Sequence, residues 1–331
     1  MSEAPPRVWV LLGSRVGDNN QLLALAEGLG LPFETRTLTY RRWWPLMLRL
    51  FPAGLALIDR RSRNFVAPPW PDLVIGIGRR SVAVARWLKR KNKRTMIVRL
   101  GNPRADPRLF DLVITTGQYP VPPGETVLRL PLAMGRHKDL PATEAETNRL
   151  AALPRPHLLF SLGGATRYWQ FPAERMADTA RQLVRRAADQ GGTLLIATSP
   201  RTPRQTVEAI RQALAAANDW ELIDDGRIRF PVLLADADEN YVTADSVSMI
   251  SEAVLAGKPV GLVPVELDPE GDKALGPQPG SSSVRDIRRF WTQLQEQGLI
   301  GTVDHPAIGR VEDSLAIAVA AVRRLLGNRV Q

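Results

Sequence analysis

Residues 242–260 read VTADSVSMISEAVLAGKPV, and this stretch has the pattern of a strand, a helix and a second strand. Two β-branched residues lead into Asp245 and Ser246, which are both preferred at helix N-termini. Gly257 and then Pro259 end the helical run before the next apolar segment. Such a unit is typical of a parallel sheet in which each helix begins beyond the carboxyl end of a strand.

The same rhythm continues in both directions along the chain. Short apolar runs, most of them closed by Gly, Pro or Asn, alternate with helical runs, as expected for βα units around parallel sheets. The runs are RVWVLLG, PDLVIGIG, TMIVRLGNP, DLVITTG, HLLFSLGG, TLLIATS and VLLADAD. Residues 118–155 interrupt the pattern with many prolines and polar residues, so we place a domain boundary there.

We therefore predict an α/β protein with two Rossmann-like domains that face each other across a cleft. The expected organisation is a basic first domain over residues 1–135, a linker over 136–155, a second domain over 156–308, and a terminal helix over 309–331. The terminal helix could pack back on the first domain.

The composition narrows the chemistry. The 331 residues include no cysteine, which excludes disulfides and thiolate metal sites. The three histidines are widely separated, so we expect no metal site. The start of the chain lacks the features of a signal peptide. The longest apolar run, residues 43–58, contains two prolines and an arginine, and we expect no transmembrane helix.

Charge is unevenly distributed along the chain. Residues 1–135 hold 21 Lys or Arg against 9 Asp or Glu, whereas the remainder holds 23 against 25. An anionic surface is therefore the expected partner of the first half. Nucleic acid is an unlikely partner, because the basic segment 86–94 has one aromatic residue and no nucleic-acid motif appears.

Aromatic and basic side chains are closely interleaved around residues 41–51. This pattern favours docking on an anionic membrane or a lipid-linked acceptor. The alternative is a helix pair packed under its own sheet with its arginines outside. The candidate membrane residues are Arg41, Arg42, Trp43, Trp44, Met47, Arg49 and Phe51.

Several strand ends in the second half could contact a phosphorylated ligand. A helix that starts at Asp245 or Ser246 could hold a phosphate at its N-terminus. Ser248 and Glu252 lie four residues apart on one helix face, where the carboxylate could accept hydrogen bonds from ribose hydroxyls. The alternative is an ordinary cap and a solvated glutamate. Neighbouring strand ends contribute Gly163, Gly164, Arg167, Ser199 and Arg201.

In the first half, the segment GSRVGDNNQ is the same kind of junction. Asp18 is its only acidic residue and a candidate general base. The alternative is that Asp18 or Asn19 caps a helix that begins near Gln21. A further strand end, IGIGRRS, places Arg79 and Arg80 where an anion could bind or where the surface is merely basic.

These segments together resemble the Elm1-like family. GDNNQ, PDLVIGIGRRSVAVARWLKR, SLGGATRYW, TSPRTP and VTADSVSMISEAVLAGKPV occur in the same order, and the resemblance covers nearly the whole chain. That family in turn resembles the GT-B glycosyltransferases, in which the C-terminal domain holds a nucleotide-sugar.

The resemblance implies roles for individual residues. Ser246 and Ser248 would contact the diphosphate and Glu252 the ribose, while Gly163, Gly164 and Arg167 would line the donor pocket. GT-B enzymes generally need no bound metal, so the nucleotide-sugar would be the substrate and no cofactor is expected. The histidine base of some GT-B enzymes has no counterpart here, which leaves Asp18 at that place.

The leading hypothesis is a transfer of sugar from a nucleotide-sugar to a lipid-linked or lipopolysaccharide-type acceptor. We expect the protein to be cytoplasmic and peripheral on the inner face of the cytoplasmic membrane. Two alternatives stay open: a nucleotide-sugar 2-epimerase, which shares the fold, and a non-catalytic membrane adaptor related to the plant fission protein.

Overall fold

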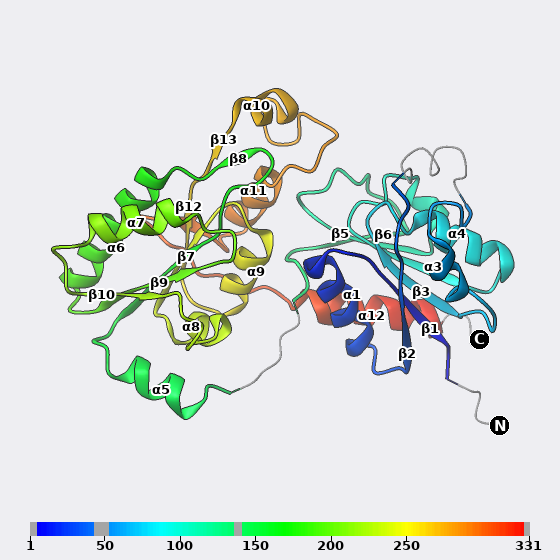
Figure 1. The fold of residues 1–331 in the computed structure, drawn as a ribbon, viewed down its shortest axis with the longest axis horizontal. Helices are drawn as coiled ribbons and strands as arrows, with labels where there is room; N and C mark the ends of the chain where they lie inside the picture. The colour runs from blue at the N-terminus through cyan, green and yellow to red at the C-terminus, as the bar shows by residue number, and fades with distance from the viewer. Residues whose placement is uncertain (1–4, 43–52, 136–140, 328–331) are drawn as a thin grey trace. The chain divides into compact units, whose positions relative to one another are not determined.

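The computed structural model describes residues 5–42, 53–135 and 141–327 (Figure 1). The chain divides into two compact units, which are described separately below. The first unit comprises residues 1–137 and 312–331, and the second comprises residues 138–311. In the described ranges, no helix is both long enough and apolar enough to cross a bilayer.

The first unit is built on a parallel sheet of six strands in the order β2-β1-β3-β4-β5-β6. Its strands are β1 (Val8–Leu12), β2 (Phe33–Thr37), β3 (Leu73–Ile77), β4 (Met96–Leu100), β5 (Leu112–Thr116) and β6 (Val127–Leu130). Its helices are α1 (Val16–Gly28), α3 (Arg60–Asn64), α4 (Val82–Lys91), the short 3-10 helix η1 (Pro107–Leu109) and α12 (Ser314–Gly327). The central strands are apolar along their length because helices or loops cover both faces of the sheet.

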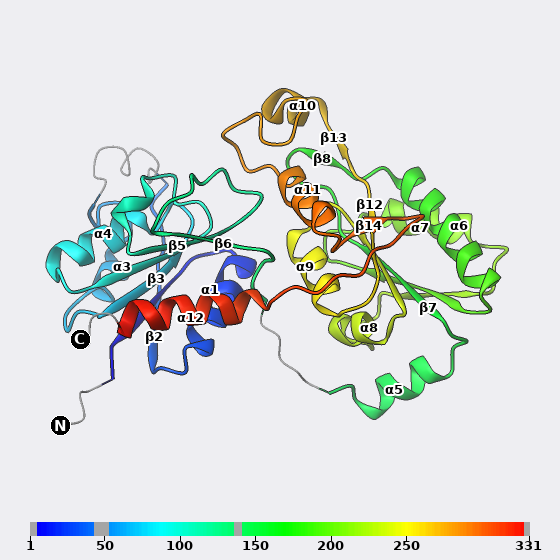
Figure 2. The same ribbon diagram turned by 180° about the vertical axis from the view of Figure 1, so that it is seen from behind.

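Helix α12 belongs to this first unit although it ends the chain. Its residues Ala318, Val319 and Val322 are buried in one apolar cluster with Leu22 and Leu25 of α1. At its start, the Ser314 hydroxyl accepts a hydrogen bond from the backbone N–H of Leu132 at 3.1 Å. Figure 2 shows α12 beside α1, so the chain crosses to the second unit and returns.

The second unit repeats the architecture with a parallel sheet in the order β10-β9-β7-β11-β12-β14. These strands are β7 (His157–Leu162), β9 (Thr193–Thr198), β10 (Trp220–Ile223), β11 (Glu239–Thr243), β12 (Val260–Val263) and β14 (Gly301–Thr302). A separate antiparallel pair joins β8 (Trp169–Gln170) to β13 (Glu266–Leu267). The helices are α5 (Glu144–Ala151), α6 (Ala173–Asp189), α7 (Arg204–Ala213), α8 (Phe230–Asp236), α9 (Val247–Leu255), α10 (Pro269–Leu275) and α11 (Arg288–Glu296).

Each sheet has one point where the strand order reverses. In the first unit β1 lies between β2 and β3, and in the second unit β7 lies between β9 and β11. The connections on the two sides of such a point run in opposite directions, which leaves a crevice outside the carboxyl ends of the strands. Ligands of doubly wound proteins bind at such crevices, so each unit offers one candidate position.

Helix α5 lies within residues 136–155, which the sequence predicted as a linker. Glu146 makes a capping box with Thr143, since each side chain accepts a hydrogen bond from the other's backbone N–H. The same carboxylate accepts hydrogen bonds from the Arg229 guanidinium at the start of α8, at 2.8 and 2.6 Å. Glu146 therefore fastens α5 to the body of the second unit.

Replacing Glu146 with glutamine is expected to destabilise the protein at neutral pH. Hydrogen bonds from Arg229, then from the Thr143 backbone, lower the pKa of the Glu146 carboxyl from its ordinary value of 4.5. A lowered pKa stabilises the folded state above the unfolded pKa, and the effect is lost as the pH falls below about 4.5. Urea denaturation should therefore separate the variant from wild type at pH 7 and less so at pH 3.

The matched control is Glu144→Gln. Glu144 is exposed in the same helical turn, and its replacement should change stability little. Equal effects of the two substitutions at pH 7 would contradict the role given to Glu146.

Candidate functional site

The candidate site of the second unit lies where β7 and β11 end, at the reversal of strand order. After β7 the chain continues through Gly163 and Gly164, and after β11 it continues through Asp245 into α9. The two strands pair in parallel, so both loops leave the same edge of the sheet. The sequence had singled out both loops as candidate ligand contacts.

Asp245 connects these loops. Its side chain is fully buried. One carboxylate oxygen accepts a hydrogen bond from the Thr243 hydroxyl at 2.7 Å. The other accepts from the Gly164 N–H at 3.1 Å and from the Arg201 guanidinium at 2.8 Å. The predicted contact between Asp245 and a nucleotide therefore faces a physical obstacle, because the carboxylate is already bonded on both oxygens and holds the loops together.

The two glycines are required by this arrangement. A Cβ atom on Gly163 would overlap the Asp245 carboxylate, and one on Gly164 would overlap the backbone carbonyl of Arg201. The Arg201 side chain also donates to the Gly164 carbonyl at 2.8 Å, and the Ser199 hydroxyl donates to the Gly163 carbonyl at 3.0 Å. Five predicted residues are thus brought together, and their polar groups bond mainly to one another.

Helix α9 begins directly beyond this cluster. Ser246, and not Asp245, is its N-cap residue, and the hydroxyl accepts from the Met249 N–H at a long 3.5 Å. The Ser248 hydroxyl is exposed and lies 3.3 Å from that of Ser246. Two hydroxyls therefore lie at the positive end of a helix, where an anion is stabilised.

Glu252 lies one turn further along α9, on the face of Ser248. Its carboxylate is partly buried and forms no hydrogen bond or ion pair with any residue in the described ranges. Burial raises the pKa of Glu252 above its usual value. A partly desolvated carboxylate without a protein donor has its acceptor capacity available for a ligand.

Arg167 does not join this group. Its guanidinium is mostly exposed and pairs with Glu270 at 3.3 Å, and it lies 4.9 Å from the centre of the Tyr168 ring. It belongs to the turn before β8, where the backbone pairs Thr166 with Trp169. A direct role for Arg167 in the donor pocket stays a prediction.

Trp291 is a neighbour of the site that the sequence reasoning missed. Its indole N–H donates to the Ala244 carbonyl at 2.9 Å, immediately before Asp245. Its ring packs 5.0 Å from that of Trp169. Trp291 lies in α11, far along the chain, and no local pattern connects it with residue 244; only an unusual tryptophan in an amphipathic helix could have drawn attention to it.

In the first unit, the expected helix start near Gln21 is wrong, because α1 begins at Val16. Arg15 is the N-cap residue and its side chain makes no capping hydrogen bond. The Asn19 side-chain amide accepts a hydrogen bond from the Gly13 N–H at 3.0 Å and donates one to the Gly13 carbonyl at 2.9 Å. Asp18 is in the first turn of the helix and is not its cap, so its role as a base stays a prediction.

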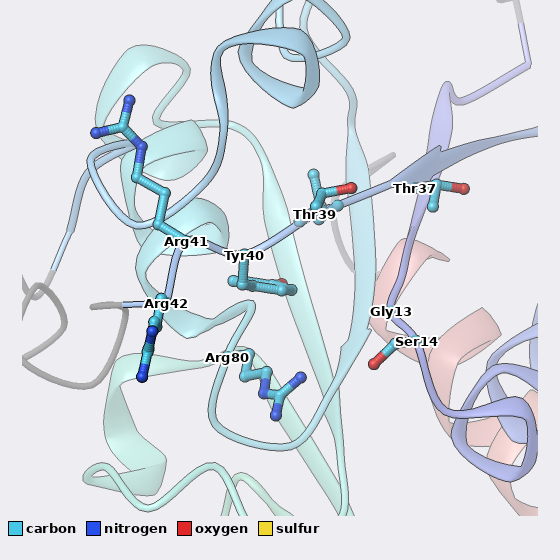
Figure 3. Close-up of a pocket in the computed structure, with 9 residues that line it drawn as sticks. Gly13, Ser14, Thr37, Thr39, Tyr40, Arg41, Arg42 and Arg80 are labelled. Carbon is cyan, nitrogen blue, oxygen red and sulfur yellow. The ribbon is translucent and has the colours of Figure 1, made fainter.

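The predicted membrane segment is only partly described. Trp43, Trp44, Met47, Arg49 and Phe51 lie outside the described residues. Arg41 and Arg42 are exposed and line a pocket of the first unit together with Tyr40 and Arg80 (Figure 3). No group of three or more His, Asp or Glu side chains in the described ranges is arranged to hold a metal ion.

Comparison with known proteins agrees with the resemblance inferred from the motifs. The family described as mitochondrial fission ELM1 matches residues 16–324. The chain belongs to this family. The match spans both units, from the start of α1 into α12, and it includes the segment from β11 to β12.

Two relatives illustrate the range of the family. The mitochondrial fission protein ELM1 of Arabidopsis thaliana is 29% identical over 245 residues, which are 65% of this chain and 56% of the plant protein. The uncharacterised protein RP120 of Rickettsia prowazekii (strain Madrid E) is 23% identical over 294 residues, which are 76% of this chain and 82% of that protein.

Solved structures with the same fold are enzymes of nucleotide-sugar metabolism. S. aureus MnaA in a co-structure with UDP has a TM-score of 0.54 at 12% identity and covers 98% of this chain and 97% of its own. A UDP-glucosyltransferase from Polygonum tinctorium has a TM-score of 0.54 at 11% sequence identity, and the match covers 98% of this chain and 99% of the glucosyltransferase. The Neisseria meningitidis UDP-GlcNAc 2-epimerase bound to UDP-GlcNAc has a TM-score of 0.50 at 13% sequence identity, and the match covers 97% of this chain and 100% of the epimerase. The fold is therefore GT-B-like, with two Rossmann-like α/β domains, as predicted.

Proposed function

We propose that the protein is a GT-B-type glycosyltransferase that binds a nucleotide-sugar at the start of α9. The observation that carries the proposal is Glu252, a partly buried carboxylate one turn beyond Ser248 that accepts no hydrogen bond from any residue the structure describes. This pair lies at the reversal of strand order in the second unit. The fold is shared with enzymes whose structures hold UDP or UDP-GlcNAc.

The chemistry of the site suits a diphosphate linked to a ribose. The positive end of α9 and the Ser246 and Ser248 hydroxyls would bind phosphate oxygens. Glu252 would accept hydrogen bonds from the ribose hydroxyls, which would replace the water it loses on burial. The charge that develops on the leaving diphosphate would then be stabilised by fixed dipoles, without a bound metal or other cofactor.

The loops behind this surface would keep it in position. Asp245, Gly164 and Arg201 are joined by hydrogen bonds of 2.8 and 3.1 Å, and the backbone there cannot shift without breaking them. We assign Asp245 to positioning the start of α9. Preorganised dipoles are effective in catalysis because they need no reorganisation in the transition state.

The acceptor is proposed to be lipid-linked or of the lipopolysaccharide type. Support comes from the basic first half of the sequence and from the exposed Arg41 and Arg42. The protein would then act as a peripheral protein on the inner face of the cytoplasmic membrane, with Asp18 as the candidate base. Attraction to anionic lipid is worth about 1 kcal/mol for each basic residue near the surface.

A thermal-shift screen with UDP, GDP, CMP and ADP, each with and without Mg²⁺, tests the donor site. A ligand at about 100 times its dissociation constant stabilises a protein by about 2.7 kcal/mol, which gives a visible rise in melting temperature. We expect one nucleotide diphosphate to stand out, without need of Mg²⁺. The absence of any shift at millimolar nucleotide would contradict the proposal.

A 2-epimerase is the second candidate, favoured by the epimerases that share the fold. It differs from the transferase in needing no acceptor. Incubation of the protein with UDP-GlcNAc alone, followed by analysis of the sugar, distinguishes the two enzymes. Nucleotide binding with neither reaction would favour the non-catalytic adaptor; the plant relative is named as a mitochondrial fission protein.

A further inference from the structure

The pocket of the first unit lies at the carboxyl ends of β1, β2 and β3. It has a volume of about 370 Å³. The described residues that line it are Gly13, Ser14, Thr37, Leu38, Thr39, Tyr40, Arg41, Arg42 and Arg80. These include three arginines and several hydroxyl groups, and none of them is acidic. The pocket lies at the reversal of strand order, the same topological position that the α9 site occupies in the second unit.

A buried cation lies behind this pocket. Arg99 of β4 is fully buried, and its guanidinium donates to the Ser81 hydroxyl at 2.9 Å and to the Gly78 carbonyl. Its Nε–H has no hydrogen-bond partner among the residues that the structure describes. Arg99 forms no ion pair with any carboxylate in the described part of the chain. A buried arginine is ordinarily paired with an acid, because an uncompensated charge in the interior is costly.

The backbone is built to admit this guanidinium. Arg99 is the register partner of Gly76 in β3. A Cβ atom at residue 76 would overlap the Arg99 guanidinium. The side chain therefore crosses β3 over a glycine and reaches the loop between β3 and α4. Arg80, which lines the pocket, belongs to that loop, so the buried charge and the pocket are joined by one short segment.

Tyr40 links the two arginines. Its ring centre lies 5.9 Å from the Arg80 guanidinium carbon, and Figure 3 shows Tyr40 and Arg80 side by side, with Arg41 directed away. Burial raises the pKa of Tyr40 to about 12, although Arg99, Arg80 and Ser81 act in the opposite direction. The phenol is therefore neutral at pH 7 and does not neutralise either arginine. Burial likewise lowers the pKa of Arg99 to about 10, so its charge persists at pH 7.

We propose that this pocket binds a phosphate-bearing anion, which compensates the buried charge of Arg99, contacts Arg80 in the pocket lining and accepts hydrogen bonds from the surrounding hydroxyls. Arginine is suited to the planar recognition of phosphate oxygens. The phosphate could belong to a soluble phosphorylated molecule or to a lipid headgroup. The inference deepens the acceptor side of the proposed function, on which it rests for the first unit, and it does not depend on the donor site at α9.

Inorganic pyrophosphate is the first probe, used with the full chain in calorimetric titration and thermal-shift measurements. Arg80→Gln removes one charge from the pocket and should weaken pyrophosphate binding at least tenfold. The matched control is Arg79→Gln, which removes the adjacent exposed charge outside the lining and should leave the affinity within twofold. An equal loss in both variants, or no binding to wild type, would overturn the proposal.

Arg99→Met separates a binding role from a structural one. A buried ion replaced by an apolar side chain of similar length often leaves stability unchanged or raises it. We therefore expect the free variant to melt no lower than wild type and to lose the rise in melting temperature with pyrophosphate. A lower melting temperature with an unchanged response would show that Arg99 only supports the loop. If this variant does not fold, the pyrophosphate affinities of Tyr40→Phe and Arg80→Gln still test whether the pocket binds a phosphate-bearing anion.

Vesicles identify the source of the phosphate. Phosphatidylcholine vesicles that contain phosphatidic acid are compared with vesicles that contain phosphatidylserine at the same surface charge. If the protein prefers vesicles with phosphatidic acid and pyrophosphate releases it from them, the pocket binds a lipid headgroup. If the protein binds pyrophosphate but pyrophosphate does not release it from vesicles, the pocket binds a soluble ligand. The rise in melting temperature with UDP is measured in parallel for wild type and Arg80→Gln. If UDP stabilises both proteins while neither binds pyrophosphate, this inference fails and the proposed function stands.

Discussion

Replacing Asp245 with alanine is expected to lower the free energy of unfolding by about 3 kcal/mol, the largest effect on stability that we predict. The substitution removes a fully buried carboxylate that accepts hydrogen bonds from Thr243, Gly164 and Arg201. The Thr243 hydroxyl and the Gly164 N–H are both buried and would be left without this acceptor. Urea denaturation monitored by circular dichroism measures the change.

The control for this prediction is Asp224→Ala. Asp224 also pairs with an arginine, Arg211, at 3.4 Å, but both side chains are about half exposed. Exposed ion pairs contribute between about 0 and 1 kcal/mol, so this variant should unfold close to wild type. A loss at Asp245 no greater than that at Asp224 would show that the β7 and β11 loops do not depend on the buried carboxylate. Nucleotide binding should also be lost in Asp245→Ala, because the start of α9 would no longer be held.

Replacing Glu252 with glutamine is expected to weaken nucleoside diphosphate binding at least tenfold while the protein stays folded. A charged acceptor forms stronger hydrogen bonds with ribose hydroxyls than a neutral amide does. Calorimetric titration with the nucleotide found in the thermal-shift screen measures the loss. The control is Glu208→Gln, a substitution at an exposed position of α7 in the same unit, and this variant should bind the nucleotide as wild type does.

The stability of the ligand-free Glu252→Gln protein tests the same assignment independently. Burial raises the pKa of Glu252, so the folded state binds its proton more tightly than the unfolded state does. The ionised carboxylate therefore destabilises wild type at neutral pH, and this penalty disappears as the pH falls below about 4.5. The variant should be the more stable protein at pH 7, with the difference vanishing near pH 4. A variant less stable than wild type at pH 7 would mean that Glu252 has a structural partner.

Much of the fold could be predicted from local sequence. A buried parallel strand needs a short apolar run, and a helix start needs a small polar residue, so residues 242–260 already contained the strand, helix and strand of β11, α9 and β12. The order of several such units predicted two Rossmann-like domains, and the likeness to GT-B enzymes came from the resemblance to the Elm1-like family. The start of α1 was misplaced because Arg15 makes no capping bond and therefore leaves no capping signal in the sequence.

The candidate site was predictable in position but not in the role of each residue. The rule that ligands bind beyond strand ends located Gly163, Ser246 and Glu252. It did not show that both carboxylate oxygens of Asp245 already accept hydrogen bonds within the protein, or that Arg167 pairs with Glu270 outside the cluster. Those outcomes depend on partners more than 40 residues away in the chain, and a single sequence does not specify them.

The sequence by itself determined the alternation of strands and helices, the uneven charge and the α9 segment with its Ser248 and Glu252, because each depends on residue type and spacing within one element. Only the tertiary structure decided that Trp291 reaches Ala244, that α12 returns to the first unit, and that Arg99 is buried without a carboxylate partner among the described residues. In β4, Arg99 occupies one position in an apolar strand, and a lone arginine there is ordinarily expected to reach solvent. Its burial follows from strand pairing, which places Gly76 beside it and gives the guanidinium a path across the sheet.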